Sequence, residues 1–419
     1  MFEITWITIY LIKIYLFLKK EIIKKKHSSS DKIAIIGGLG HVGLPLGLIF
    51  VDKNHEVILI DNNLKNKNTI LKGKMPFHEE NGNRFLKNAI KKNKISITNQ
   101  ASSIESCKHI IICIGTPIDE YLNPKTSSFL KSLEPYFHYF KKTHNIIIRS
   151  SVYPGVCDIF FEKLKKRKIN NLSYCPERIV QGKAITEINN LPQIISGYSS
   201  KSINLSKNLF SKICKHSLIC EVREAELIKL FSNSWRYVSF AIANQFMMIC
   251  DEENISYSKI RDKMTFKYDR AKNIPLAGFA AGPCLLKDTM QLNSFAGFNN
   301  PIFSAAMSVN EGLPNYYIKM IKKKFGIKKV SVGILGMAFK QDIDDTRDSL
   351  SFKLKKLLEM NKYKVYISDY FINKFNFDEK ELIKKSDVIV LAVPHKKYQK
   401  LRIPKHKFVI DTWGIVNWY

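Results

Sequence analysis

The sequence predicts an α/β fold with two nucleotide-type units joined by a long central helix. Apolar strands and a glycine-rich turn near the start indicate one parallel sheet, and a second set of short apolar strands fills the last ninety or so residues. With 419 residues the chain is too long for a single core. We therefore expect an N-terminal Rossmann dinucleotide-binding domain over 32–215, a central helical and dimerisation domain over 216–325, and a C-terminal Rossmann-like α/β domain over 326–419.

Residues 1–31 read as an apolar and basic extension that ends in a polar linker. The apolar run of 1–18 contains Glu3 and Lys13, and a cluster of lysines follows it. A secretory signal has its positive charge before the apolar run, so that interpretation is excluded. Three alternatives stay open for residues 1–26: a membrane anchor with the body on the cytoplasmic side, a helix lying on the membrane surface, or an extension upstream of the true start.

The turn after the first predicted strand carries a dinucleotide-binding pattern. A strand is expected over 32–36, a helix over 44–52 and a second strand over 56–60. The turn reads G-x-G-x-x-G, and an acidic residue ends the second strand, as in NAD-binding βαβ units. A glycine turn without a ligand is the alternative. The residues expected to contact the cofactor here are Gly38, Leu39, Gly40, His41, Val42, Gly43 and Asp61.

Each position in that turn has a physical reason. We expect Gly38 to allow the tight turn, Gly40 to let the backbone approach a pyrophosphate, and Gly43 to let helix and strand pack closely. Asp61 would accept hydrogen bonds from the ribose hydroxyls and repel a 2′-phosphate. The predicted cofactor is therefore NAD and not NADP.

Two later strands, over 109–114 and 145–148, end in small polar residues. Because the carboxyl ends of parallel strands face the ligand crevice, Thr116 and Ser151 are candidates to meet the cofactor. Ordinary turn chemistry is the alternative for both segments.

The pattern over 224–253 predicts a long helix that is apolar on several faces and therefore buried between domains or subunits. Lys229 and Asn233 lie four residues apart, so they share one face of it. A lysine on such a helix needs a partner or a function. A surface lysine that extends its charge into water is the alternative.

Cys284 is the candidate nucleophile. It follows Gly282 and Pro283 and precedes Lys287 and Asp288. A thiol beside a lysine and an aspartate suits covalent chemistry, such as holding an aldehyde as a tetrahedral adduct before a second oxidation. A buried structural thiol is the alternative, since that is the commonest state of a free cysteine.

The C-terminal unit is predicted to contain strands over 330–336, 364–369, 387–393 and 408–411, with a helix over 349–359. Its glycines do not complete the dinucleotide pattern, so a mononucleotide site is more plausible there than a second NAD site.

Charge and cysteine content narrow the function classes. The net charge is +30, but lysines recur along most of the chain, whereas a nucleic-acid or membrane binder usually concentrates them on one element. We expect no nucleic-acid partner, although the positive field would help to collect an anionic substrate. None of the eight cysteines forms a C-x-x-C pair. We therefore expect no disulfide scaffold, no metal site and a reducing cytoplasmic location, with association with the inner membrane face if residues 1–26 contact it.

These motifs, taken in order, resemble the nucleotide-sugar 6-dehydrogenases, which include UDP-glucose and UDP-N-acetylhexosamine dehydrogenases. The resemblance runs from about Lys32 to near the C-terminus. It is carried by GLGHVG at 38–43, GTP at 115–117, SSVYPG at 150–155, CPER at 175–178, ELIKLFSN at 226–233, GPCLLKD at 282–288, Phe339-Lys340 and DDTR at 344–347.

The resemblance implies a four-electron oxidation. Enzymes of this family oxidise the sugar C6 alcohol to a carboxylate with two NAD⁺, through a cysteine thiohemiacetal and a thioester. It also implies a homodimer and a product that feeds surface polysaccharide synthesis. The CPER segment and the segment Asn233-Ser234-Trp235-Arg236 favour a UDP-N-acetylhexosamine as substrate.

The same resemblance implies a role for each matched residue. Cys284 would be the nucleophile, and Lys229 with Asn233 would stabilise the oxyanion. Asp288 would position water or the lysine, and Glu177 would serve the hydrolytic step. Ser151 stands where the family usually has threonine, and we expect it to contribute to catalysis and to cofactor binding. The residues expected to bind the substrate are Glu177, Arg178, Lys229, Asn233, Lys340 and Arg347.

The chain departs from the family pattern at three places. The loop 276–282 has fewer glycines than usual, Gln245 replaces a glutamate, and the N-terminal extension has no counterpart.

The alternative functions are a UDP-glucose 6-dehydrogenase, an ordinary two-electron NAD dehydrogenase, and a non-catalytic sensor of NAD or nucleotide sugar.

Overall fold

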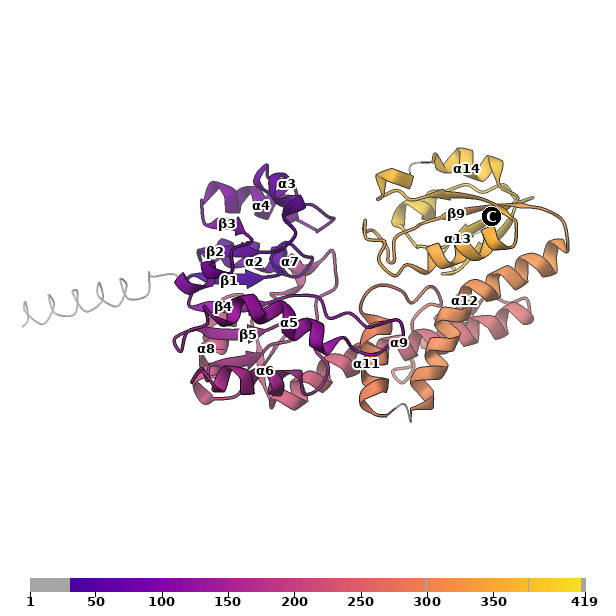
Figure 1. Ribbon diagram of the computed structural model, residues 1–419. Helices are drawn as coiled ribbons and strands as arrows, with labels where there is room; N and C mark the ends of the chain where they lie inside the picture. Colours follow the sequence, from indigo (N-terminus) through magenta and orange to yellow (C-terminus); the bar gives the residue numbers. More distant parts are fainter. Residues whose placement is uncertain (1–30, 298–299, 376, 416–419) are drawn as a thin grey trace, which may run out of the picture.

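A computed structural model describes residues 31–297, 300–375 and 377–415 (Figure 1). It contains an eight-stranded sheet whose strands lie within residues 33–219, a central group of helices, and a four-stranded sheet near the C-terminus. The predicted α/β fold with a Rossmann domain at each end and a helical middle is therefore confirmed. The interpretations of residues 1–26 lie outside the described residues.

The first sheet has the strand order β3-β2-β1-β4-β5-β6-β7-β8 and is parallel except at the β6–β7 pair. Its central strands are short aliphatic runs buried on both faces, which is typical of parallel sheets covered by helices. Strand order reverses between β1 and β4, so the ligand crevice is expected at the carboxyl ends of these strands. The strands are β1 (Ile33–Ile36), β2 (Val57–Ile60), β3 (Ile95–Thr98), β4 (His109–Ile112), β5 (Asn145–Ile148), β6 (Leu172–Tyr174), β7 (Gln193–Gly197) and β8 (Ser217–Ile219).

Helices cover both faces of this sheet and enclose two apolar layers. One layer includes α2 (Gly43–Asp52), α4 (Gly82–Lys91), α7 (Ala184–Glu187) and α8 (Ser200–Phe210). The other includes α5 (Thr126–Phe137) and α6 (Val156–Lys165). Shorter elements are α3 (Lys67–Leu71), η1 (Leu64–Asn66) and η2 (Ala101–Ser106).

The central domain is built on the 31-residue helix α9 (Val222–Glu252), which begins two residues before the predicted start at a capping box of Glu221 and Glu224. Near its start the buried carboxylate of Glu226 accepts hydrogen bonds from the backbone N–H groups of Gly155, at 2.9 Å, and Cys157, at 3.2 Å. Those groups begin α6, so α9 is fixed to the first domain by a charge at a helix N-terminus. The other helices are α10 (Tyr257–Thr265), α11 (Leu285–Phe295) and α12 (Pro301–Phe325).

The C-terminal sheet is parallel, with the order β10-β9-β11-β12. Apolar residues of α12 and α13 pack with one face, and residues of α14 pack with the other. Its elements are β9 (Ser331–Leu335), α13 (Leu350–Met360), β10 (Lys364–Ser368), η3 (Asn373–Phe375), α14 (Glu379–Lys385), β11 (Val388–Leu391), η4 (Lys396–Lys400) and β12 (Phe408–Asp411).

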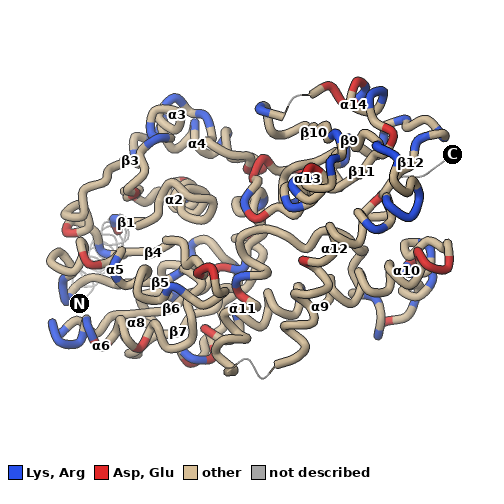
Figure 2. Tube along the Cα trace, turned by 45° about the vertical axis from the view of Figure 1, so that its right-hand side comes forward, with Lys and Arg blue, Asp and Glu red and all other residues tan. Residues whose placement is uncertain are grey.

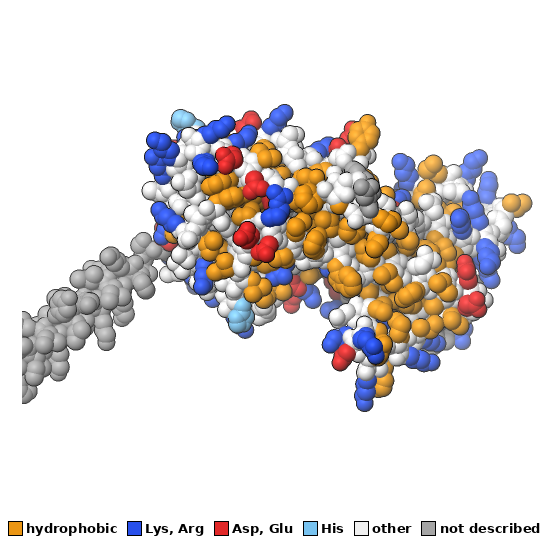
Figure 3. All heavy atoms as spheres, turned by 90° about the horizontal axis from the view of Figure 1, so that it is seen from below, with side chains coloured by type: hydrophobic (Ala, Val, Ile, Leu, Met, Phe, Trp, Pro, Cys, Tyr) orange, Lys and Arg blue, Asp and Glu red, His pale blue; other side chains and the backbone are white. Residues whose placement is uncertain are grey.

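Among the residues that the structure describes, lysines and arginines are distributed over both sheet domains and are not confined to one element (Figure 2). Apolar side chains do gather on one face, seen in Figure 3. Large exposed apolar residues recur along α9, namely Phe231, Trp235, Ile242, Phe246 and Ile249, and Trp235 is 69% exposed. Within the part of the chain that the structure describes, no helix combines the length and the apolar character needed to cross a membrane.

Candidate active site

The glycine-rich turn between β1 and α2 forms a cradle for an anion. The left-handed residue is Gly37, with φ of +78°, so the tight turn lies one residue before the predicted Gly38. Gly38 is required for another reason: a Cβ there would lie 2.8 Å from the carbonyl oxygen of Ile35 and from Leu59. A Cβ on Gly43 would collide with the carbonyl oxygen of Gly37, as expected for close packing of helix and strand.

Gly40 differs from these glycines because a Cβ there would meet no atom closer than 3.5 Å. The protein therefore leaves the space in front of the α2 N-terminus open, where a pyrophosphate can approach the helix dipole. The exposed Gly40 and the partly buried His41 and Val42 border this space.

Asp61 follows β2 and stands beside the turn. Its carboxylate accepts hydrogen bonds from the backbone N–H groups of Leu39, at 3.1 Å, and Asn63, at 3.0 Å. A carboxylate has further lone pairs that can accept the ribose hydroxyls. The open cradle at Gly40 and the fixed carboxylate at Asp61 together fit NAD.

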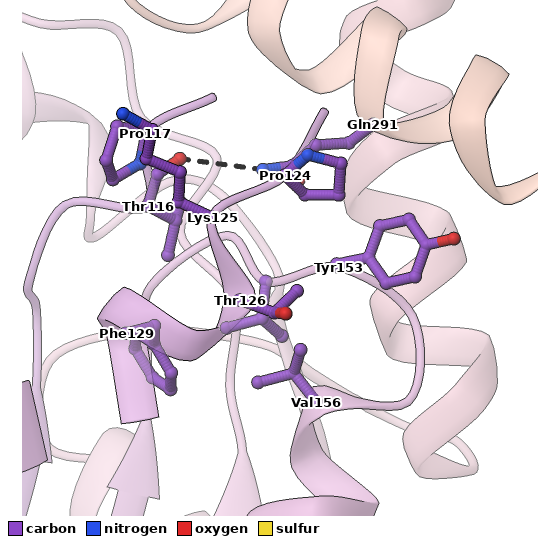
Figure 4. Close-up of a pocket in the computed structure, with 10 residues that line it drawn as sticks. Thr116, Pro117, Pro124, Lys125, Thr126, Phe129, Tyr153, Val156 and Gln291 are labelled. Carbon is purple, nitrogen blue, oxygen red and sulfur yellow. Dashed lines mark hydrogen bonds between the residues drawn. The ribbon is translucent and has the colours of Figure 1, made fainter. Parts of the chain in front are cut away.

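The loops after β4 and β5 meet each other and the start of α11. The Thr116 hydroxyl donates to the carbonyl oxygen of Ser151. The Lys287 ammonium lies 3.3 Å from the Thr116 hydroxyl, and the Gln291 amide lies 3.5 Å from the Thr116 carbonyl oxygen. Figure 4 shows Thr116 and Gln291 among the residues that line a small pocket, together with Tyr153. The two strand-end loops are thus joined to the helix that follows Cys284.

Cys284 lies immediately before α11 and is exposed. Its loop is held against the C-terminal domain, because the Gly282 N–H donates to the carbonyl oxygen of Asp348 at 3.2 Å. Gly282 has a φ of +98°, and a Cβ there would overlap the ring of Phe339. The candidate nucleophile is therefore accessible at a point where the central and C-terminal domains touch.

Four charges around the thiol act in opposite directions. The loss of solvation among surrounding protein atoms raises the pKa of Cys284, and the Asp288 carboxylate raises it further. Lys229, Lys287 and Arg347 favour the thiolate and lower the pKa. The charges of Lys229, Lys287, Asp288 and Arg347 therefore all act on the Cys284 thiol, and the roles that the resemblance implies for Lys229 and Asp288 stay predictions.

Asp288 is fully buried and joins the other candidates. One carboxylate oxygen accepts a hydrogen bond from the Asn233 amide at 2.6 Å, and the other is paired with the Lys287 ammonium. Lys229 lies one helical turn before Asn233 on α9 and is 8% exposed. Its ammonium group shows no hydrogen bond or ion pair with any residue that the structure describes.

Glu177 and Arg178 are held within the first domain. The Glu177 carboxylate is paired with the buried Arg149 and accepts hydrogen bonds from the N–H groups of Arg178, at 2.7 Å, and Ile179, at 2.9 Å. The Arg178 guanidinium donates to the carbonyl oxygen of Pro192 at 2.6 Å. Neither charged end is free in this structure, so their roles at the substrate stay predictions.

Lys340 and Arg347 extend from the loop after β9. The Lys340 ammonium donates to the carbonyl oxygen of Gln181 at 2.8 Å, and burial lowers its pKa to about 8. Arg347 is paired with Asp345, with an Nη2–Oδ2 distance of 2.6 Å. These two predicted substrate cations therefore lie where the first and last domains meet.

From the sequence, Lys287 was noted only as the lysine beside the thiol, and no role was predicted for Gln181 or Asp345. The spacing of Lys287 agrees with a place near the sulfur, because a residue three positions after Cys284 on a helix faces the same side. Gln181 and Asp345 carry no such local signal, since they are 164 residues apart in the chain.

Comparisons with known proteins agree along the length of the chain. Three domain models of the UDP-glucose/GDP-mannose dehydrogenase family match it: the NAD binding domain over 31–214, the central domain over 223–312 and the UDP binding domain over 333–417. A UDP-N-acetyl-D-mannosamine dehydrogenase of Methanococcus maripaludis is 27% identical over 416 residues, which cover 94% of this chain and 95% of the relative.

Solved structures share the fold. A UDP-glucose dehydrogenase from Pyrobaculum islandicum superposes with a TM-score of 0.85 at 20% identity, covering 92% of this chain and 95% of that one. A UDP-N-acetyl-D-mannosamine dehydrogenase from Pyrococcus horikoshii also gives 0.85, at 23% identity, with 92% and 96% covered.

Proposed function

Since the chain belongs to the UDP-glucose/GDP-mannose dehydrogenase family and is an NAD-dependent nucleotide-sugar dehydrogenase, we propose that its substrate is a UDP-N-acetylhexosamine, whose C6 alcohol it oxidises to a carboxylate. The curated relative of Methanococcus maripaludis, named for UDP-N-acetyl-D-mannosamine, supports this choice of sugar. The observation that carries the chemistry is an exposed Cys284 residue one helical turn before the buried Asp288, whose charge acts together with that of Lys229 on the pKa of the thiol.

The reaction proceeds in two oxidations and one hydrolysis. With NAD⁺ bound, the C6 alcohol would lose a proton to solvent and a hydride to the cofactor, giving an aldehyde. The Cys284 thiolate would add to the aldehyde carbon, and the resulting oxygen would take up a proton to form a thiohemiacetal. With a second NAD⁺ as hydride acceptor, that adduct would lose the proton and a hydride and leave a thioester. Water would then add to the thioester carbon and break the C–S bond, which releases the carboxylate, the thiolate and two protons.

The residues around the sulfur suit each stage. The Lys229 ammonium is the donor available for the oxygen that carries negative charge during addition and hydrolysis. Asn233 has a second amide hydrogen for the same oxygen, because only one is needed by Asp288. The positive charges of Lys229, Lys287 and Arg347 favour the thiolate that must attack. NAD supplies the hydride acceptor when it is bound at the Gly40 cradle.

The number of NADH molecules formed per sugar tests this function. The purified chain, incubated with NAD⁺ and a panel of UDP- and GDP-sugars, should form two NADH for each UDP-N-acetylhexosamine consumed. Cys284→Ser should abolish net oxidation to the acid. One NADH per sugar with an unaffected serine variant would indicate a two-electron dehydrogenase, and binding without turnover would indicate a sensor. A preference for UDP-glucose would contradict the proposed sugar.

We also propose that the chain forms a homodimer through the exposed apolar face of α9. Phe231 and Trp235 are 54% and 69% exposed on a helix whose other faces are packed, and such a surface is costly to leave in water. Trp235→Glu should shift the sedimentation of the protein from dimer to monomer. An unchanged sedimentation coefficient would refute the use of this face.

A cytoplasmic location and a product used for surface polysaccharide synthesis complete the proposal. All eight cysteines are free thiols in the structure, which suits a reducing compartment. Fractionation of cells that express the chain, with and without residues 1–26, tests whether that segment attaches the protein to the inner membrane face.

A further inference from the structure

Gln181, which lies between β6 and α7 in the first domain, makes three contacts that reach beyond its own neighbourhood. Its side-chain nitrogen lies 2.7 Å from a carboxylate oxygen of Asp345 and 3.1 Å from Nδ1 of His41. Its backbone carbonyl oxygen accepts a hydrogen bond from Lys340 at 2.8 Å. Gln181 therefore contacts the cofactor turn and Lys340 directly. It is linked to the second predicted substrate cation, Arg347, through Asp345.

The orientation of this amide follows from its partners. A carboxylate can only accept hydrogen bonds, so the group that faces Asp345 must be the amide nitrogen of Gln181. The same nitrogen faces Nδ1 of His41, which must then be the unprotonated ring nitrogen. The His41 proton therefore lies on Nε2, which is 3.5 Å from Asp345. Burial lowers the pKa of His41 to about 4, so the ring is neutral near physiological pH.

Asp345 passes this contact on toward the sulfur. The carboxylate is almost fully buried and accepts hydrogen bonds from the backbone N–H of Arg347, at 2.9 Å, and from its guanidinium. Arg347 in turn interacts electrostatically with Cys284. A continuous set of hydrogen-bond contacts thus runs from His41 in the NAD turn, through Gln181 and Asp345, to Arg347.

We propose that Gln181 is a positioning residue that couples NAD binding to nucleotide-sugar binding. NAD seated at the turn holds His41, and His41 with Gln181 holds Asp345 and Arg347 in the orientation that receives the sugar nucleotide. The ligand that binds first orders these contacts, so the ligand that binds second meets a smaller ordering cost. The inference rests on the proposed roles of Lys340 and Arg347 at the substrate.

The coupling is measured as the ratio of two NAD dissociation constants, obtained by calorimetry without UDP and with saturating UDP. The unaltered chain should bind NAD about fivefold or more tightly in the presence of UDP. Gln181→Leu removes both amide contacts at similar volume, and the ratio should fall to about one. Gln399→Leu, an exposed glutamine on η4 of the C-terminal domain, is the matched control and should keep the full ratio.

Further variants keep the test decisive. Gln181→Asn has an amide too short to reach Asp345 and His41 together, so it should lose the ratio even if the leucine variant folds poorly. Asp345→Asn should also lose it, and the double variant with Gln181→Leu should lose no more than either alone, because both changes break one path. A full ratio in well-folded Gln181→Leu or Gln181→Asn, or no coupling in the unaltered chain, overturns the inference. If the unaltered chain binds neither NAD nor UDP, the proposed function fails as well.

Discussion

Replacing Asp288 with asparagine should make Cys284 more reactive and the enzyme much slower. Desolvation is the largest cause that raises the pKa of Cys284, and the Asp288 carboxylate is the next. Once that negative charge is removed, desolvation still raises the pKa, but no opposing charge counters Lys229, Lys287 and Arg347. The pKa of Cys284 should therefore fall, and the thiolate should be a larger fraction at neutral pH.

Turnover should change in the opposite direction. Asparagine has one acceptor oxygen where the carboxylate has two, so its amide nitrogen must face either Lys287 or the Asn233 amide, donor against donor. A lost hydrogen bond to a charged group costs about 1.5–3 kcal/mol, so we expect the free energy of unfolding to fall by about 2 kcal/mol. If the Asn233 donor is displaced from the oxyanion, kcat should fall by about 10²–10³-fold.

The assay compares alkylation with turnover in the same preparations. Iodoacetamide should label Cys284 faster in Asp288→Asn than in the unaltered chain at about pH 7, and mass spectrometry of the peptide that contains Cys284 measures the rate. Asp269→Asn is the control, because the Asp269 side chain is 93% exposed and pairs only with Lys272 among the described residues. Slower or equal labelling in Asp288→Asn would refute the electrostatic role of this carboxylate, even if turnover were lost.

Three further changes test other parts of the structure. Burial raises the pKa of Glu79 to about 7 from 4.5, so the folded chain should lose about 3 kcal/mol of stability as pH rises through that interval. Glu79→Gln should make the thermal midpoint less dependent on pH between about 5 and about 8. At about pH 8 the midpoint of the variant should be higher than that of the unaltered chain. Asp61→Asn should raise the KM for NAD by about tenfold and weaken discrimination against NADP in steady-state assays. Gly278→Ala, which places a Cβ within the ring of Trp413, should lower the free energy of unfolding by about 1–3 kcal/mol, whereas Gly312→Ala, with nothing near its Cβ, should not. An equal midpoint shift in the two glycine variants, or a steeper pH dependence in the glutamine variant, would contradict these expectations.

The first domain could be predicted because its signals are local. Buried parallel strands are aliphatic runs of four or so residues, and the glycine turn and Asp61 lie within one βαβ unit. The position of the tight turn is a detail in which the structure differs from the prediction. Positive φ at Gly37 depends on how β1 meets the carbonyl of Cys113, which the glycine spacing alone does not contain.

The loop before Cys284 has fewer glycines than the family pattern, and the sequence alone does not show which glycines the fold requires. The segment 276–282 keeps only Gly278 and Gly282, and both have positive φ. Each lies under an aromatic ring, Trp413 for the first and Phe339 for the second, so these are the two positions where a side chain would not fit. The rings come from the C-terminal domain, more than fifty residues away, and no local pattern announces them.

Contacts between distant charged residues were the least predictable part of the site. Glu177 was assigned to hydrolysis by resemblance, yet its carboxylate is paired with Arg149, which follows β5 and lies 28 residues earlier in the chain. Residue type alone does not say whether a glutamate faces the substrate or a buried arginine. That choice depends on which strand ends are neighbours, and β5 and β6 bring these two residues together.

The partners of each cation decide which one can serve the reacting oxygen. Lys287 is engaged with Asp288 and Thr116, and Arg347 is engaged with Asp345. An ammonium or guanidinium group that already donates hydrogen bonds to a carboxylate gains little by binding a new oxyanion. To do so it must break an interaction with a group of equal negative charge. Lys229 has no such partner among the described residues, although it is nearly as buried as Asp288. We therefore expect Lys229, whose hydrogens are not committed to a carboxylate, to be the chief stabiliser of the oxyanion, and we expect Lys287 and Arg347 to act mainly on the charge of the sulfur.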